Sequence, residues 1–240
     1  MRIAVLDDDR LLLEMMERVI QEMGNTCQLY ETGQACLQDL RRETFDMLIV
    51  DWELPDTSGP EVATWTRQEL GPDLPILIVT LRSEETDIVH GLHSGADDFM
   101  SKPLRVAEFK ARVAALLRRA YPASTEEVQQ FGPYRLDRTT LTVHFGEEAI
   151  ALTHREFSLA LLLFQNPGRL MSRDYLREAI WGQNAEVLSR TLDTHISRLR
   201  QQLQLRPGAQ YAITAVYGLG YRLDALGSTT APVQDTELPA

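Results

Sequence analysis

The sequence predicts an α/β fold for the first half of the chain and an α+β fold for the second. Up to Ala120, short and nearly continuous apolar runs alternate five times with helical patterns. This alternation is typical of a doubly wound (βα)5 domain with a five-stranded parallel sheet. Beyond residue 130 the apolar runs shorten and alternate with polar residues, which indicates a small antiparallel sheet, and helical patterns follow them.

The same patterns predict the domain boundaries. We expect one domain over residues 1–120 and a second over residues 131–223, and 240 residues are enough to give each a core. The small, polar residues 121–130 predict a linker. Residues 224–240 are rich in Thr, Pro and Ala without periodicity, so we expect a disordered tail.

The strands of the first domain are predicted where apolar runs end in polar residues. Glycines at or just past three of the helical patterns suit C-terminal caps. The strand runs are Arg2–Leu6, a run around Cys27, Phe45–Val50, Pro75–Val79 and Asp97–Ser101. The helical patterns are Leu11–Met23, Gln34–Arg42, Pro60–Leu70, Glu84–Ser94 and Val106–Arg119.

The second domain is predicted to begin with three short strands and to end with a hairpin. Between them lie three helical patterns, the first of which stops at Asn166-Pro167-Gly168. The strands are Tyr134–Leu136, Leu141–His144 and Ala149–Leu152, and the helices are His154–Gln165, Arg173–Trp181 and Leu188–Leu203. The hairpin joins Ile213–Val216 to Tyr221–Leu223 through Gly218-Leu219-Gly220.

Charge is distributed unevenly along the chain. The formal net charge of −11 argues against nucleic acid as a partner, but residues 1–121 hold 22 acidic and 13 basic residues and so carry most of it. Residues 187–206 hold four Arg and one acidic residue, and a local basic stripe matters more for DNA than the total does. Neither a signal peptide nor a membrane span is predicted, so we expect a cytoplasmic protein.

Polar side chains collect at the carboxyl ends of four predicted strands. They are Asp7 and Asp8, Asp51, Thr80 and Lys102. Strand ends of a parallel sheet meet at one edge, where ligands bind. Three carboxylates can hold Mg²⁺, while Lys102 and Thr80 can contact a phosphoryl group. The alternative is that Asp residues at strand ends only begin turns.

The first domain resembles the receiver domain of two-component response regulators. The matching segments are Val-Leu-Asp-Asp-Asp (5–9), Asp-Trp-Glu-Leu-Pro-Asp-Thr-Ser-Gly (51–59), Ile-Val-Thr (78–80) and Gly-Ala-Asp-Asp-Phe-Met-Ser-Lys-Pro-Leu (95–104). The resemblance implies that Asp51 is the phosphoacceptor. It also implies Mg²⁺ as cofactor, with Asp7, Asp8, Asp51 and the backbone carbonyl of Glu53 as its ligands.

The resemblance further implies a switch. Thr80 and Lys102 would contact the phosphoryl oxygens, and space vacated by Thr80 would admit Phe99, the switching aromatic. The alternative for Phe99 is plain core packing. Lys102-Pro103 stands where the family usually has a cis peptide. Leu81 departs from the small residue common at its position, which bears on access to Asp51.

The basic helix predicted over residues 189–203 has an apolar stripe, Leu192, Ile196, Leu199 and Leu203. A helix can pack such a stripe on the core and present polar side chains to a DNA groove. We expect the packing of the stripe to turn His195 and Arg198 outward. The alternative is a solvated surface helix without a ligand.

The second domain resembles the winged-helix effector domain of the OmpR/PhoB family over about residues 131–223. Matching segments include Leu-Thr-His-Arg-Glu-Phe (152–157), Asn-Pro-Gly-Arg-Leu-Met-Ser-Arg (166–173), Ile-Trp-Gly (180–182), residues 190–200 and Gly-Leu-Gly-Tyr-Arg-Leu (218–223). The resemblance implies a winged helix-turn-helix fold. Its candidate DNA contacts are Arg190, Thr191, Thr194, His195, Arg198, Arg200 and, near the wing, Tyr221. Ser197 and Tyr217 stand where many members carry Arg.

Together the two resemblances imply a transcription regulator that is not an enzyme. A sensor histidine kinase would phosphorylate it, and the resulting homodimer would bind tandem half-sites of double-stranded DNA, with RNA polymerase as a further candidate partner. The implied dimer face contains Asp97, Asp98, Glu108, Arg112 and Arg118 or Arg119, while Ile88 replaces a usual basic residue. The runner-up is a protein-interaction module whose DNA domain is weak.

Overall fold

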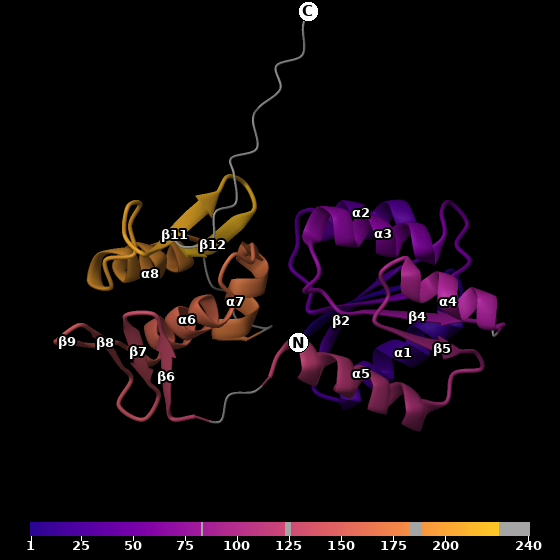
Figure 1. The fold of residues 1–240 in the computed structure, drawn as a ribbon, viewed down its shortest axis with the longest axis horizontal. Helices are drawn as coiled ribbons and strands as arrows, with labels where there is room; N and C mark the ends of the chain where they lie inside the picture. Colours follow the sequence, from indigo (N-terminus) through magenta and orange to yellow (C-terminus); the bar gives the residue numbers. More distant parts are fainter. Residues whose placement is uncertain (83, 123–125, 183–188, 226–240) are drawn as a thin grey trace, which may run out of the picture. The chain divides into compact units, whose positions relative to one another are not determined.

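The computed structural model describes residues 1–82, 84–122, 126–182 and 189–225. The chain divides into two compact units, the first ending at residue 125 and the second beginning at residue 126 (Figure 1). None of the described helices combines the length and the apolar character that crossing a bilayer requires.

The first unit is a five-stranded parallel sheet with helices on both faces, as the apolar runs predict. The strands lie in the order β2-β1-β3-β4-β5, with α2, α3 and α4 on one face and α1 and α5 on the other (Figure 1). The strands are β1 (Arg2–Leu6), β2 (Thr26–Tyr30), β3 (Met47–Asp51), β4 (Ile76–Thr80) and β5 (Asp98–Ser101). The helices are α1 (Arg10–Glu22), α2 (Gly33–Leu40), α3 (Gly59–Leu70), α4 (Glu85–His93) and α5 (Val106–Ala120).

Two apolar cores hold this unit together, one on each face of the sheet. Successive side chains of a strand point to opposite faces. Ile3 and Val5 therefore join the core beneath α1 and α5, whereas Ala4 and Leu6 join the core beneath α2, α3 and α4. All residues of the central strands β3 and β4 are buried, which explains why these strands appear in the sequence as unbroken apolar runs.

The helix beginnings close to the sheet edge are set by capping side chains. Asp9 accepts hydrogen bonds from the backbone N–H groups of Leu11 and Leu12, so α1 begins directly after the Asp7–Asp9 run. Ser58 and Glu61 form a reciprocal capping box at the start of α3. These caps fix the loops that follow β1 and β3.

In its described residues, the second unit combines two small antiparallel sheets with three helices, which follow one another in the predicted order. The first sheet contains β6 (Val128–Phe131), β7 (Tyr134–Asp137), β8 (Thr142–Phe145) and β9 (Glu148–Ala151). The second has the order β10-β12-β11, formed by β10 (Met171–Ser172), β11 (Tyr211–Val216) and β12 (Gly220–Ala225). The helices are α6 (His154–Gln165), α7 (Arg173–Trp181) and α8 (Ser189–Gln202).

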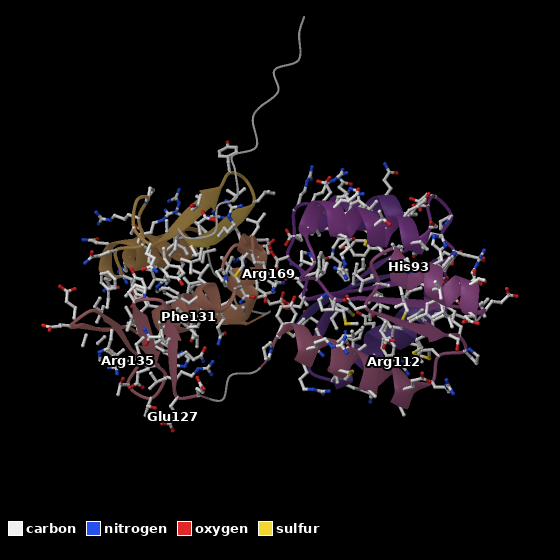
Figure 2. The ribbon with its side chains drawn as sticks, in the orientation of Figure 1. His93, Arg112, Glu127, Phe131, Arg135 and Arg169 are labelled. Carbon is white, nitrogen blue, oxygen red and sulfur yellow. The ribbon has the colours of Figure 1, made fainter. Side chains whose placement is uncertain are left out.

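The structure differs from the sequence-based boundaries at both ends of this unit. β6 begins within the stretch expected to be a linker. These residues form a strand because they pair with β7, and Gln129 is buried there. Phe131, labelled in Figure 2, packs against Phe164 of α6 with 5.5 Å between ring centroids. β12 continues to Ala225, two residues into the expected tail. Residues 226–240, the rest of that tail, lie outside the described residues.

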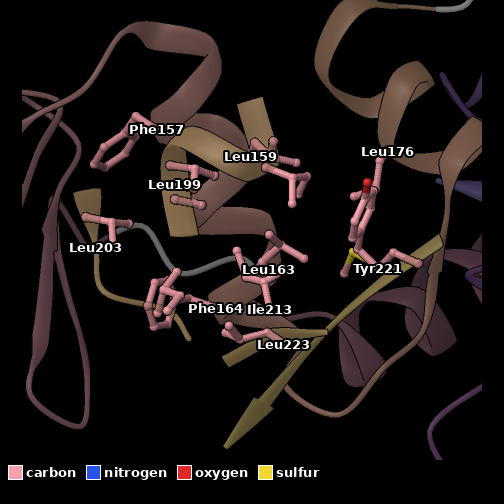
Figure 3. Close-up of a cluster of buried hydrophobic side chains, with 14 of the residues drawn as sticks. Phe157, Leu159, Leu163, Phe164, Leu176, Leu199, Leu203, Ile213, Tyr221 and Leu223 are labelled. Atoms are coloured by element: carbon pink, nitrogen blue, oxygen red, sulfur yellow. The ribbon is translucent and has the colours of Figure 1, made fainter. Parts of the chain in front are cut away.

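The core of the second unit lies between the helices and the hairpin. Figure 3 shows Phe157 and Leu163 of α6 and Leu199 of α8 in one cluster with Ile213 and Leu223 of the hairpin. Where β12 pairs with β10, Gly220 allows the two strands to approach closely. A Cβ atom at Gly220 would lie 1.9 Å from the carbonyl oxygen of Met171, so the approach requires glycine.

Candidate functional site

The carboxyl edge of the parallel sheet brings together the polar residues that the sequence places at strand ends. Asp7 and Asp8 follow β1, Asp51 ends the neighbouring strand β3, and one carboxylate oxygen of each lies within 4.8 Å of the others. Thr80 ends β4, and Lys102 follows β5. The three carboxylates and Lys102 are therefore brought together as expected, so Asp7 and Asp8 do more than begin a turn, while Thr80 lies at the end of the strand next to β3.

Lys102 lies between two of the carboxylates. Its Nζ is 2.8 Å from Asp7 Oδ2 and 2.8 Å from Asp51 Oδ2, and both carboxylates are buried. Two negative charges at this depth are costly unless a cation offsets them. One ammonium offsets only part of the charge of three carboxylates. The pocket thus has both the charge and the hard oxygen donors that suit a divalent cation.

The environment shifts the pKa of Asp51 and that of Lys102. Burial raises the pKa of Asp51 above its ordinary value, the hydrogen bond from Lys102 opposes this, and the nearby charge of Asp7 adds to it. Burial alone lowers the pKa of Lys102, but its hydrogen bonds to Asp51 and Asp7 outweigh burial, so that pKa is raised. Lys102 is accordingly a fixed positive charge beside a crowded carboxylate.

Backbone donors orient the two buried carboxylates. The Trp52 N–H donates to Asp51 Oδ1 over 2.6 Å, and the Asp9 N–H donates to Asp7 Oδ1 over 2.9 Å. The second oxygen of each carboxylate is the one near Lys102. The peptide bond Lys102-Pro103 is cis, as expected from the resemblance.

Thr80 and Phe99 are both buried in this structure. Thr80 Oγ1 accepts a hydrogen bond from the Arg82 N–H over 3.2 Å. Phe99 is 9% exposed, and its ring packs edge-on against Trp52 with 6.4 Å between centroids. Phe99 is thus packed in the core beside Trp52 in this structure, and its movement into space vacated by Thr80 stays a prediction.

Four side chains around Trp52 were missed by the sequence reasoning. Arg82 lies over the Trp52 ring, and His90 packs against the edge of that ring at 5.4 Å. Arg82 also forms ion pairs with Glu53 and Asp87. These residues come from three separate segments without a shared motif, so no local sequence signal identifies the cluster.

The residues expected on the dimer face divide into two groups. Arg112 of α5, labelled in Figure 2, donates to both carboxylate oxygens of Asp98 over 2.8 Å and to Glu108 over 2.7 Å. Asp97 instead accepts from Arg67 of α3 and from the Ile76 N–H. Asp97 is thus bound to α3 and to the start of β4 within the chain, and its place on the dimer face stays a prediction. Exposed apolar side chains on these elements are Val89 and Leu92 of α4 and Val106 of α5.

The apolar stripe of α8 is packed into the core, as predicted. Leu192, Ile196, Leu199 and Leu203 have no exposed surface, and Figure 3 shows Leu199 and Leu203 within the core cluster. The other side of the helix carries exposed residues, among them Arg190, Thr194, Ser197 and Arg198. The helix therefore has the two-sided character that a groove-binding helix needs.

Three of the expected DNA contacts are turned towards the protein. The side chain of His195 is 15% exposed and lies between Trp181 and Glu156, so the prediction that it turns outward is wrong. Tyr221 is buried, and its hydroxyl donates to Asp193 over 2.6 Å. Arg200 Nε donates to the carbonyl oxygen of Ile213 over 2.8 Å. These side chains are engaged in holding α8 on the unit.

The remaining candidates are accessible. The side chain of Arg198 is 59% exposed, although its Nη1 reaches within 3.4 Å of Glu156. Thr191 is half-buried, and the Thr194 hydroxyl donates to the carbonyl oxygen of Arg190. Tyr217, at the tip of the hairpin between β11 and β12, is fully exposed. Arg190, Thr194 and Arg198 thus form the outward polar face of α8, with Tyr217 as a separate exposed side chain.

Comparison with known proteins gives two family matches. Residues 3–114 match the response regulator receiver domain, and residues 146–223 match the C-terminal domain of transcriptional regulatory proteins. The phosphate regulon transcriptional regulatory protein PhoB of Rhizobium meliloti is 36% identical over 225 residues, covering 93% of this chain and 99% of that protein. PhoB of Escherichia coli is 35% identical over 223 residues, which cover 92% of this chain and 96% of that protein.

One solved structure aligns with nearly the whole of this chain. The response regulator DrrB of Thermotoga maritima, described as an OmpR/PhoB homologue, is 30% identical to this chain and aligns with a TM-score of 0.46. The alignment covers 93% of this chain and 99% of that one.

Proposed function

The chain belongs to the OmpR/PhoB family of two-component response regulators, and from this premise we propose that Asp51 is its phosphoacceptor. Its relatives are DNA-binding transcription regulators rather than enzymes, and the chain is such a regulator. The observation that carries the assignment to Asp51 is its place at the end of β3, 2.8 Å from Lys102 and beside Asp7 and Asp8.

In the proposed reaction an Asp51 carboxylate oxygen attacks the phosphorus of a phosphohistidine on the sensor kinase. The new O–P bond forms as the P–N bond breaks, and the imidazole nitrogen leaves with the electron pair. Lys102 lies where it can neutralise charge on the transferring group, which is most of what phosphoryl transfer requires. The Trp52 N–H holds the second oxygen of Asp51 in place during the transfer.

The acidic pocket could bind a metal, and we assign Mg²⁺ to it. Asp7, Asp8, Asp51 and the backbone carbonyl of Glu53 would hold the ion, which prefers a few hard oxygen ligands together with waters. When bound, Mg²⁺ supplies positive charge that offsets the phosphoryl oxygens. The fit is supported by the excess of carboxylates over the single ammonium of Lys102.

The output is regulated binding of DNA. A C-terminal regulatory domain and a receiver together imply a histidine kinase and DNA as partners. We assign the recognition contacts to the outward face of α8, with Arg190, Thr194 and Arg198 foremost and Thr191 beside them. The phosphorylated form would be a homodimer on tandem half-sites, with Asp98, Glu108, Arg112 and Arg119 on the dimer face and RNA polymerase as a further partner. The cytoplasm, where DNA is accessible, is its proposed place of action.

The assignment of Asp51 is tested by intact-mass measurement. The full chain is incubated with Mg²⁺ and acetyl phosphate, and we expect the mass to increase by one phosphoryl group that acid releases. Asp51→Ala should show no increase, whereas Asp56→Ala, which alters another carboxylate of the same loop, should still be modified. Undiminished phosphorylation of Asp51→Ala would refute the assignment. Asp8→Ala should slow the reaction and weaken its dependence on Mg²⁺.

A further inference from the structure

Arg82 joins three segments that surround the pocket. It lies two residues beyond the end of β4, and its Nε and Nη2 donate to Glu53 Oε1 over 3.1 and 3.0 Å. Its Nη1 donates to Asp87 Oδ1, in the first turn of α4, over 3.4 Å. The guanidinium also lies over the Trp52 ring, 5.4 Å from the centroid. One side chain thus ties the two residues that follow Asp51 to the start of α4.

The backbone of Arg82 holds the hydroxyl of Thr80. The Arg82 N–H donates to Thr80 Oγ1 over 3.2 Å, which is a local side-chain turn within the loop. Among the residues that the structure describes, no hydrogen bond joins this hydroxyl to Asp51. A bond from this hydroxyl to a phosphoryl group on Asp51 would therefore compete with the turn that it forms with the Arg82 N–H.

The same guanidinium covers a ring that connects Asp51 with α4. The Trp52 N–H donates to Asp51, and the Trp52 ring packs against His90 of α4 and against Phe99 of β5. Gly91 provides room for this packing, since a Cβ atom there would lie 3.1 Å from the Trp52 ring. Arg82 therefore contacts a residue that is bonded to the phosphoacceptor and packed against α4.

We propose that Arg82 is a latch that holds Thr80 and α4 in the arrangement of the unphosphorylated chain, and that phosphorylation of Asp51 has to release it. The proposal rests on Asp51 being the phosphoacceptor. Arg82 is a positioning residue that acts through Thr80, Glu53 and Asp87. Its side chain is 44% exposed, so salt screens its ion pairs and each contributes little. A latch of this strength can be opened by a single modification.

The test measures the initial rate of phosphorylation by acetyl phosphate with Mg²⁺, using the full chain. Arg82→Ala removes the latch, and we expect phosphorylation about three- to tenfold faster, as loss of two exposed ion pairs and a cation–π contact allows. Glu53→Gln and Asp87→Asn remove one carboxylate each and should give smaller increases. The double variant Arg82→Ala/Glu53→Gln should be no faster than Arg82→Ala alone, because both changes open the same contact.

These variants separate a latch from a simple effect of charge. Acetyl phosphate is an anion, so by charge alone the loss of Arg82 should slow the reaction and the loss of Glu53 should speed it. The latch predicts faster phosphorylation in both. Lys110→Ala is the matched control, because Lys110 forms an exposed ion pair with Glu22 between α5 and α1. Its rate should equal that of the parent.

A second measurement does not need phosphorylation. Amide hydrogen exchange around Thr80, without a phosphodonor, should be faster in Arg82→Ala than in the parent and unchanged in Lys110→Ala. A slower or unchanged phosphorylation rate in Arg82→Ala, with a faster rate in Glu53→Gln, would overturn the latch in favour of charge alone. If no variant, the parent included, were phosphorylated, the proposed function would fail, and hydrogen exchange would still decide the latch: unchanged exchange in Arg82→Ala rejects it.

Discussion

Glu156, at the start of α6, connects that helix to α8. It is buried, accepts hydrogen bonds from the Thr153 hydroxyl and N–H, and lies 3.4 Å from Arg198 and 3.7 Å from His195 of α8. Burial alone raises the pKa of Glu156, but the hydrogen bonds from Thr153 and Arg198 outweigh it, so that pKa lies below its ordinary value. One carboxylate thus caps α6 and holds the inner side of the helix assigned to DNA.

A first prediction concerns the pH dependence of stability at this residue. Because the folded pKa of Glu156 is depressed, its carboxylate stabilises the fold above the ordinary pKa of 4.5, and that contribution is lost as the pH falls through the folded value. Glu156→Gln should therefore lower the free energy of unfolding by about 1–3 kcal/mol at neutral pH, and the difference from the parent should shrink in acid. Thermal unfolding of both chains across this pH range measures it. A difference that grows in acid would contradict the sign.

A second prediction, also at the scale of residues, ranks two exposed side chains for DNA affinity. Arg198 can bind a phosphate or make a bidentate contact to guanine, and a lost base contact costs about 1–3 kcal/mol. Tyr217 is fully exposed but carries no positive charge. We therefore expect Arg198→Ala to weaken binding more than Tyr217→Ala does. Tyr217→Arg should steepen the slope of the logarithm of the binding constant against the logarithm of the salt concentration by about one.

Binding titrations at several salt concentrations decide this ranking. Ser197→Ala is a suitable control, since Ser197 is exposed on the same helix and uncharged. Binding that survives Arg198→Ala unchanged and is abolished by Tyr217→Ala would show that the hairpin, rather than α8, carries recognition.

At the scale of elements, α5 carries the proposed dimer contacts. Arg112 is bound to Asp98 and Glu108 within one chain, so a dimer that used Arg112 between chains would have to share or exchange these carboxylates. The third prediction is that Arg112→Glu abolishes the larger species that phosphorylation induces. Lys110→Glu, on the same helix but paired with Glu22 of α1, should leave that species intact. Light scattering with and without acetyl phosphate and Mg²⁺ measures both, and dimerisation of Arg112→Glu as strong as that of the parent would place the interface elsewhere.

The elements that the sequence predicts best are those whose burial is uniform. β3 and β4 are buried along their whole length, so their apolar runs mark both the strands and the carboxyl ends where Asp51 and Thr80 lie. β6 was missed because its alternation is weak: Gln129 is buried while Val128 is exposed, and only pairing with β7 makes it a strand. Local composition cannot reveal a strand that is specified by its partner.

Some of the candidate site residues could be placed from the sequence, and others could not. Asp7, Asp51 and Lys102 are brought together by the topology of a parallel sheet, which the alternation of strands and helices already implies. The orientation of His195 could not be predicted from the stripe of α8, because it depends on Glu156 and Trp181 from two other helices. Helical periodicity gives the buried side of a helix, but the flanking positions are decided by what packs beside them.

At the scale of the whole molecule, phosphorylation and recognition of DNA are assigned to different units. The first unit holds the acidic pocket and most of the net negative charge, and the second holds α8 with its exposed Arg190 and Arg198. Regulation therefore requires that a modification of Asp51 change the affinity of the second unit for DNA. To move an equilibrium between two states almost completely, the modification has to favour one by several kcal/mol.

The most direct measurement of this coupling is the affinity of the full chain for DNA with and without phosphorylation of Asp51. A binding site is first selected from genomic fragments with the phosphorylated chain, and its affinity is then titrated at one salt concentration for the parent and for Asp51→Ala, each with and without acetyl phosphate and Mg²⁺. We predict that phosphodonor tightens binding by the parent about tenfold or more and leaves Asp51→Ala unchanged. Equal affinity of the phosphorylated and unphosphorylated parent, or an equal response of Asp51→Ala, would contradict the account.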